Sequence, residues 1–168
     1  MNNETSKEIE RKIAFYFGIR THIIVPNVSW SMLPYEADMV VLHESGYADE
    51  VEIKISRADL LRDKSKYHQH DSNKFRRLWF AIPRKLEKSI PDIMERAGVL
   101  VVETNGNVTQ VRKPEINKTA IKFSDQQRLH LARLGCMRMW YLKDTLKPPE
   151  SEYMSLADVL MKLETLSP

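Results

Sequence analysis

A pair of β-rich runs separated by only four residues constrains the fold of this chain most. The runs are Tyr35–His43 and Ala48–Ser56, and Glu44–Tyr47 between them is typical of a hairpin turn. Successive side chains of a strand point to opposite faces, so Glu52 and Lys54 share one face while the alternating Val and Ile residues take the other. The segment therefore predicts an antiparallel hairpin with one apolar face and one face that carries charges.

The length of the hairpin turn decides whether Asp38 joins these charges, because directly paired residues point to the same side of a sheet. A three-residue turn at Ser45–Tyr47 would pair Asp38 with Lys54, and both would then share a face with Glu52. A two-residue turn would send Asp38 to the opposite face. We favour the three-residue turn, since its usual form includes a left-handed residue that Gly46 can supply.

Helical and strand patterns on both sides of the hairpin predict a mixed α/β fold. The first helix opens with a capping box formed by Thr5 and Glu8. The predicted helices cover residues 6–17, 57–67, 84–96, 124–146 and 155–166, and the further strands cover residues 22–26, 78–82, 99–104 and 108–112. We expect a central mixed sheet flanked by helices in residues 1–115, with residues 116–168 forming a helical extension packed on that core.

Composition places the chain among ordinary globular proteins. Hydrophobic residues make up 42% of its 168 residues, enough to build a core, which excludes disordered and low-complexity classes. No run approaches the roughly 18 apolar residues of a membrane span, and the N-terminus lacks the basic and apolar stretches of a signal peptide. The single cysteine, Cys136, excludes an internal disulfide, so we expect a cytoplasmic protein without a membrane partner.

Positive charge is concentrated in the middle of the chain. Residues 53–90 hold 11 Lys and Arg against 4 Asp and Glu, a local charge of +7, whereas the whole chain carries +3 and the remainder therefore −4. Such a distribution attracts polyanions such as nucleic acid, although a solvated surface rich in Lys and Arg would give the same count.

The charged face of the hairpin places Asp38, Glu52 and Lys54 inside otherwise apolar strands, where charges are unfavourable unless they are paired or bind a metal. Two carboxylates, a main-chain oxygen and water molecules match the octahedral oxygen ligands of Mg²⁺ or Mn²⁺. A lysine beside them would orient a water molecule and offset the negative charge that develops on a phosphate. The alternative is a cross-strand salt bridge at the end of a sheet, without a metal.

The order of these residues resembles the PD-(D/E)XK nuclease superfamily. An opening helix is followed by Asp38, 13 intervening residues, Glu52-x-Lys54 at the end of a hairpin strand, and a basic helix. Within that superfamily, the stretch from Ile23 to Leu60 is similar to bacterial and phage proteins of the MmcB-like DNA-repair type. The resemblance covers about residues 6–113, and the residue before the acid is alanine instead of the eponymous proline.

The resemblance implies a restriction-endonuclease-like core and assigns a role to each matching residue. Asp38 and Glu52 are metal ligands, the Ile53 carbonyl is a further ligand, and Lys54 is the catalytic lysine. The implied cofactor is Mg²⁺ or Mn²⁺, and the implied partner is DNA.

Many members of the superfamily add an acid from the first helix, for which Glu8 and Glu10 are the candidates here. At about 100° per residue, Glu10 lies at the edge of the apolar face of this helix, whereas Glu8 points away. We therefore favour Glu10 as a further catalytic residue. The alternative is an ordinary first-turn acid that the helix dipole stabilises.

Basic residues near the predicted hairpin could contact a nucleic-acid backbone. The candidates are Arg57, Lys64, Lys66, Lys74, Arg76 and Arg77. Each of them could instead be a plain surface residue. Trp30 and Tyr35 flank the loop before the Asp38 strand, and for them we favour core packing over stacking on an unpaired base.

The sequence thus predicts a metal-dependent endo- or exodeoxyribonuclease that hydrolyses phosphodiester bonds in bacterial or phage DNA repair or processing. One alternative is a DNA-binding repair-accessory protein whose nuclease site is weak or inactive. Another is a structural phage protein or interaction protein that recruits partners through its C-terminal helices. The residues leave open the nucleic-acid structure that is recognised, and whether a second copy of the chain or a replication or repair protein is a partner.

Overall fold

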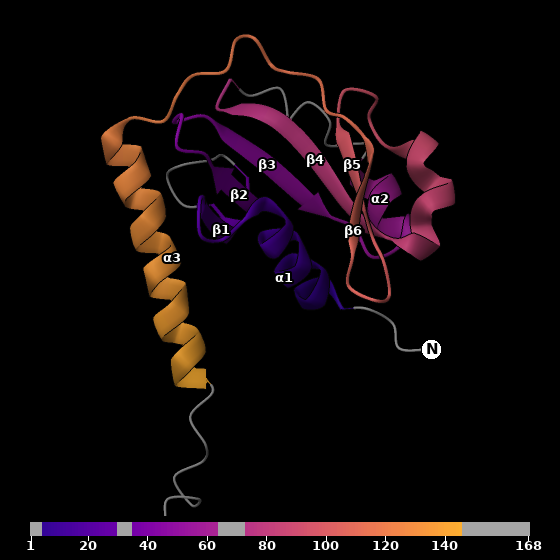
Figure 1. The fold of residues 1–168 in the computed structure, drawn as a ribbon, viewed down its shortest axis with the longest axis horizontal. Coiled ribbons are helices and arrows are strands. Elements are labelled where there is room, and N and C mark those ends of the chain that lie inside the picture. The colour runs from indigo at the N-terminus through magenta and orange to yellow at the C-terminus, as the bar shows by residue number, and fades with distance from the viewer. Residues whose placement is uncertain (1–4, 30–34, 64–72, 146–168) are drawn as a thin grey trace, which may run out of the picture. The chain divides into compact units, whose positions relative to one another are not determined.

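A computed structural model describes residues 5–29, 35–63 and 73–145 of the chain (Figure 1). In chain order the elements are α1 (Ser6–Phe17), β1 (Ile23–Val28), β2 (Ala37–Leu42), β3 (Ala48–Ile53), α2 (Arg57–Asp63), β4 (Phe75–Pro83), the 3-10 helix η2 (Arg84–Asp92), β5 (Gly98–Val102), β6 (Val108–Arg112) and α3 (Asp125–Thr145). The predicted helix over residues 155–166 lies outside the described residues. No described helix combines the length and the apolar character needed to cross a membrane.

The described strands form one six-stranded sheet in the order β1-β2-β3-β4-β5-β6. β2 pairs antiparallel with both β1 and β3. β4 pairs parallel with both β3 and β5, and β6 returns antiparallel to β5. Because crossovers between parallel strands need intervening chain, α2 follows β3 and η2 follows β4. The predicted α/β class with a mixed sheet is confirmed.

Local sequence signals explain the ends of α1 and the form of η2. Thr5 and Glu8 form the predicted capping box, and Gly18 ends α1 with a left-handed φ of +91°. The α-helix predicted over residues 84–96 is instead the 3-10 helix η2, which contains Pro91. Proline lacks an N–H and clashes with the preceding turn, so a regular α-helix cannot continue through this position.

The β2–β3 hairpin has the predicted parity but a different register. Leu42 pairs with Ala48 and Val40 with Glu50, so that Asp38 falls opposite Glu52 instead of Lys54. The three-residue turn therefore comprises residues 44–46, one position earlier than predicted. Its left-handed residue, Gly46 with φ +88°, stands last in the turn, which is where a type I turn followed by a bulge requires it.

The two faces of the sheet differ in their cover. On the first face, which we call the helix-covered face, Ile9 and Ile13 of α1 pack on Met39, Val51 and neighbouring apolar side chains. The opposite face holds two further apolar clusters. One surrounds β1, β2 and the start of α3, and the other lies between α2, η2, β4 and β5. Because β3 presents Glu50, Glu52 and Lys54 between these clusters, we call this the charged face.

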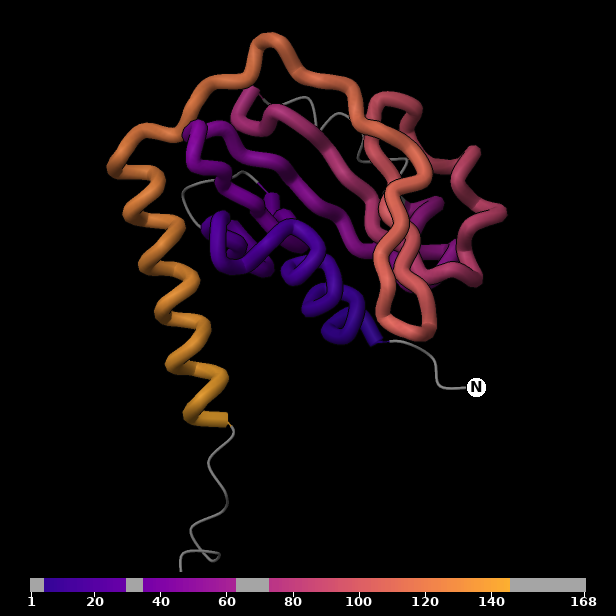
Figure 2. Tube along the Cα trace, viewed as in Figure 1, coloured from indigo at the N-terminus to yellow at the C-terminus, as the bar shows by residue number. Residues whose placement is uncertain are grey.

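The sheet belongs to a compact unit of residues 1–135, and residues 136–168 form a second unit. The segment between β6 and α3 runs along the hairpin end of the sheet (Figure 2), where Asn117 donates its N–H to the Arg76 carbonyl and Phe123 donates to the Gly46 carbonyl. Phe123 and Leu131 then join the core beside β1 and β2. The division between a core of residues 1–115 and an extension of residues 116–168 stays a prediction.

Candidate active site

Three of the predicted site residues meet where β3 ends. Lys54 Nζ lies 2.7 Å from Glu52 Oε2 and 3.9 Å from Asp38 Oδ2. Asp38 Oδ2 in turn accepts a hydrogen bond of 2.7 Å from the backbone N–H of Ile53. Because β3, β4 and β5 are parallel, this is also the carboxyl edge of the sheet, where ligands of open α/β sheets bind.

The surroundings of this site remove its charges from water. The side chain of Lys54 is 9% exposed and that of Glu52 is 6% exposed, whereas Asp38 is 36% exposed. The backbone N–H of Lys54 donates to the Ala81 carbonyl of β4 at 3.0 Å, which holds the chain in place immediately after β3. Glu52 and Lys54 are therefore buried, and solvent reaches the site at Asp38.

The pKa of Glu52 is raised to about 7, first by burial and then by the nearby negative charge of Asp38. The positive charge of Lys54 and its hydrogen bond to Glu52 act in the opposite direction without cancelling this effect. Glu52 is therefore poised near neutral pH, where an arriving cation can displace its proton.

The donor set fits a divalent cation held by two carboxylates. Glu52 Oε1 is buried and has no hydrogen-bond partner within the described residues, and an oxygen in that state is suited to a metal ligand. Mg²⁺ is commonly bound by one or two protein carboxylates together with water and substrate phosphate. Within residues 5–29, 35–63 and 73–145, no group of three or more His, Cys, Asp or Glu residues could hold a metal. The Ile53 carbonyl stays a predicted further ligand.

Glu10 lies on a different side of the sheet. It is a half-buried residue of α1, the helix whose buried Ile9 and Ile13 pack on the helix-covered face. Glu8 is occupied by the capping box, where its carboxylate accepts the Thr5 N–H at 2.7 Å, and this bond lowers the pKa of Glu8. A catalytic role for Glu10 stays a prediction.

Sequence reasoning missed Glu50, which shares the charged face with Glu52 and is only 1% exposed. Burial, and the charges of Glu50 and Glu52, raise the pKa of the half-buried Tyr35 well above its usual range. Tyr35 also packs against the core, in line with the favoured interpretation, while Trp30 lies outside the described residues. The period of two that identified Glu52 and Lys54 would also have identified Glu50.

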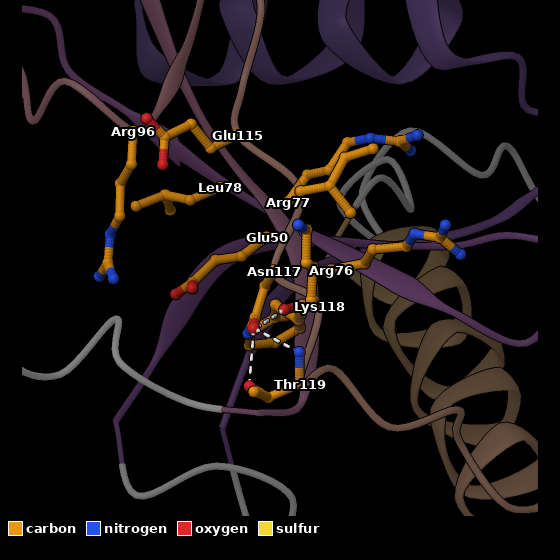
Figure 3. Close-up of a pocket in the computed structure, with 11 residues that line it drawn as sticks. Glu50, Arg76, Arg77, Leu78, Arg96, Glu115, Asn117, Lys118 and Thr119 are labelled. Carbon is orange, nitrogen blue, oxygen red and sulfur yellow. Dashed lines mark hydrogen bonds between the residues drawn. The ribbon is translucent and has the colours of Figure 1, made fainter.

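A pocket of about 320 Å³ lies beside Glu50. Its lining comes mainly from the start of β4, which includes Leu78, and from the segment that follows β6, which includes Asn117. Arg96, from the segment between η2 and β5, also lines it. Figure 3 shows the Glu50 side chain directed to the side of Arg96, whereas Arg76 and Arg77 extend away from it. The charged face therefore continues from the carboxyl edge into a recess.

The predicted backbone-binding residues are divided between the two ends of β3. Arg57 opens α2 just after Lys54, and its guanidinium lies 3.4 Å from Asp92. Lys74, Arg76 and Arg77 instead lie at the start of β4, where Arg77 pairs with Asp49 of β3. Lys54 follows Asp49 by five positions, roughly 16 Å along a strand. Lys64 and Lys66 lie outside the described residues.

No protein-family model matches the chain, and no curated protein matches it. Among solved structures, the chain is similar to a protein of unknown function from Silicibacter pomeroyi, with a TM-score of 0.63 and 16% sequence identity. The match covers 93% of this chain and 99% of the other. At this identity the likeness concerns the fold alone, and it supports the α/β architecture.

Proposed function

We propose that this protein is a metal-dependent deoxyribonuclease that hydrolyses phosphodiester bonds in DNA repair or processing, with Mg²⁺ or Mn²⁺ as cofactor. The meeting of Asp38, Glu52 and Lys54 at the carboxyl edge carries the proposal, because Lys54 Nζ lies 2.7 Å from one carboxylate and 3.9 Å from the other. The order of an opening helix, an antiparallel hairpin and a following helix agrees with the resemblance to the PD-(D/E)XK superfamily.

Each of the three residues has a task in this reaction. Asp38 and Glu52 would hold the ion, and the bound ion supplies Lewis-acid polarisation of the phosphodiester. Lys54 donates hydrogen bonds from its ammonium group to an attacking water or a phosphate oxygen. Because Lys54 is largely removed from water, its charge offsets negative charge in the transition state more strongly than a solvated lysine would.

Exposed positive charge supports DNA binding at the same edge. Arg57 follows Lys54 by three residues, and its side chain is exposed at the start of α2. Contacts from arginine to phosphate position a nucleic acid without reading its sequence. We therefore infer that the enzyme contacts the DNA backbone beside the scissile bond.

A DNA-binding accessory protein with a weak or inactive site is the second candidate. The placement of Lys74, Arg76 and Arg77 favours it. These cations lie at the end of β4 that is remote from Asp38 and Glu52. Such a protein would bind DNA through the hairpin end and would not need the carboxyl edge.

Cleavage assays separate the two candidates. Wild type, Lys54→Met and Asp38→Asn are incubated with Mg²⁺ or Mn²⁺ and with linear, circular, single-stranded and branched DNA. We expect both variants to lose at least about a hundredfold in rate while they keep their affinity for DNA. Lys7→Met, an exposed change in the first turn of α1, is the matched control and should cleave like wild type.

The assay also has a result that would contradict the nuclease. If wild type binds DNA but cleaves none of these substrates with either metal, the accessory protein becomes the better description. If Lys54→Met cleaves as fast as wild type, the three residues form a salt-bridge cluster and the chemistry lies elsewhere.

A further inference from the structure

A second charged pocket lies at the opposite end of β3, beside the hairpin turn. Its volume is about 320 Å³, and it is lined by His22, His43, Ser45, Tyr47, Arg76 and Arg77, with Glu44 as its acidic member. Two guanidinium groups and two imidazole rings thus line one concave surface. Figure 3 shows that Arg76 and Arg77 extend away from Glu50, so their charges are directed away from the recess on the charged face.

A buried carboxylate restrains the donors of this pocket. Asp49 is 1% exposed, and its Oδ2 accepts a hydrogen bond of 3.2 Å from Trp79 Nε1. The same oxygen lies 3.1 Å from His43 Nε2 and 3.5 Å from Arg77 Nη1. The His22 ring packs edge-on against His43, with ring centroids 4.6 Å apart. Because these contacts fix the side chains before a ligand arrives, the pocket is preorganised.

Unsatisfied polar atoms gather at the same place. His22 Nδ1, His43 Nε2 and Asp49 Oδ1 are buried, and none of them has a hydrogen-bond partner in the described part of the chain. The close contact between His43 and Asp49 does not have hydrogen-bond geometry. A buried polar atom without a partner destabilises the folded protein. Three such atoms in one cluster call for a bound polar group, either ordered water or a ligand.

The charge of the lining favours an anion over a metal ion. Arg77 already lies against Asp49, which opposes a second cation there. The described residues also contain no group of three His, Cys, Asp or Glu residues that could hold a metal. Positive charge is added at the rim, where Arg76 lies 4.2 Å from the centroid of the Tyr47 ring and Lys122 lies 5.4 Å from it.

Phosphate monoesters match these donors better than simpler anions do. A phosphate monoester carries a charge of about −1.5 to −2 at neutral pH and has three strong acceptor oxygens. Guanidinium groups such as those of Arg76 and Arg77 bind such oxygens through paired hydrogen bonds.

We propose that the pocket at the hairpin end binds a phosphate monoester through His22, His43, Arg76 and Arg77. Inorganic phosphate and the 5′-terminal phosphate of a nucleic acid share this chemistry. The inference does not depend on the proposed nuclease activity, because the pocket lies at the other end of β3 from Lys54. Asp49 is a positioning residue that acts through His43 and Arg77.

Calorimetric titration of the full chain tests the proposal. The titrants are inorganic phosphate, a 5′-phosphorylated oligonucleotide and the same oligonucleotide without its phosphate, all with a chelator present to prevent metal-dependent cleavage. We expect phosphate-bearing titrants to bind wild type, and their affinity to fall about tenfold or more in Arg76→Gln and in His43→Gln. Arg11→Gln, an exposed change on α1, is the matched control and should bind like wild type.

Each outcome decides the matter in one direction. Binding that both pocket variants weaken supports the proposal, and the tighter of the two phosphate-bearing titrants identifies the source of the phosphate. Equal binding of the two oligonucleotides, with no binding of inorganic phosphate, would overturn it. In a separate titration without chelator, Zn²⁺ binding to wild type that His43→Gln abolishes would also overturn it, in favour of a metal. Thermal unfolding of each variant without ligand verifies that it is folded, and two variants are used so that one unfolded protein does not end the test.

Discussion

Strand β3 carries a buried carboxylate near each of its ends, and the two have opposite surroundings. Asp49 Oδ2 accepts hydrogen bonds from Trp79 Nε1 and Arg77 Nη1, and His43 Nε2 lies 3.1 Å from the same oxygen. Glu52, three residues later, has Lys54 at 2.7 Å, and that lysine also lies 3.9 Å from a second acid, Asp38. Asp49 thus has a guanidinium group of its own, whereas Glu52 shares the positive charge of Lys54 with Asp38.

This difference separates two kinds of buried acid. A carboxylate that the chain surrounds with donors fixes those donors, so Asp49 is suited to hold a binding surface for an anion. A carboxylate that is short of positive charge gains from a cation brought by a ligand, so Glu52 is suited to hold a metal. Burial alone does not distinguish them, since both side chains are almost inaccessible to solvent.

The strongest test of this comparison is the removal of Asp49. Asp49→Ala leaves the Trp79 indole N–H and the Arg77 guanidinium without their acceptor, so we expect the free energy of unfolding to fall by about 3 kcal/mol. Urea denaturation measures the loss. Glu44→Ala, an exposed acid of the same hairpin, is the control and should change stability little. An Asp49→Ala protein as stable as wild type would show that Asp49 does not anchor this end.

Glu52 should have the opposite effect to Asp49: its ionisation should lower the stability of the folded protein, and the pH dependence of stability should show this. Burial and the charge of Asp38 raise its pKa from 4.5 to about 7 in the folded protein. Between these values the folded protein keeps a proton that the unfolded chain releases, so this group lowers stability as pH rises through the window and has no effect below it. Because Gln cannot ionise, Glu52→Gln should gain about 3 kcal/mol relative to wild type between about pH 4.5 and pH 8.

Urea denaturation of wild type and Glu52→Gln across that pH range measures this difference. Glu44→Gln is the matched control, and its stability should follow that of wild type at every pH. Parallel curves for wild type and Glu52→Gln would mean that Lys54 neutralises Glu52 fully, and the contrast with Asp49 would disappear.

The sequence predicted the carboxyl edge better than the hairpin end, for a physical reason. Asp38, Glu52 and Lys54 lie on one hairpin, so side-chain alternation and the parity of one turn bring them together. The register was wrong by one turn position because the left-handed Gly46 stands last in the turn. Glu10 could not be placed relative to these acids, because the packing of α1 on a particular face is a long-range property.

The hairpin-end pocket could not be derived from local patterns. His22 and Arg77 come from outside the hairpin that holds His43 and Asp49, and only the parallel pairing of β3 with β4 brings Arg77 to Asp49. That pairing follows a crossover through α2, whose length and direction no local period specifies. The 3-10 helix is a different case, since its cause, Pro91, is local and stands in the sequence.

The smallest effect should come from a substitution of Gly46. This residue lies in the turn of the β2–β3 hairpin, whose register positions the side chains at both ends of β3. Its φ of +88° is unfavourable for a residue with a Cβ, so Gly46→Ala should lower the free energy of unfolding by about 1 kcal/mol. Gly46→Asn should lower it less, because asparagine tolerates the left-handed region. A Cβ would also meet the guanidinium of Arg128, a flexible group that can move aside. Ser45→Ala in the same turn is the control, and urea denaturation compares the three.

The binding properties of the same variants show what fixes the register. A slip by one residue would turn Glu52 and Lys54 toward the helix-covered face, where Met39, Val51 and Ile53 are packed under α1. The core therefore opposes a slip, and a folded Gly46→Ala protein should keep the Mg²⁺ and phosphate affinities of wild type. If titration showed that both affinities are lost together, the turn, and not the core, would set the register, and the two ends of β3 would not be independent sites.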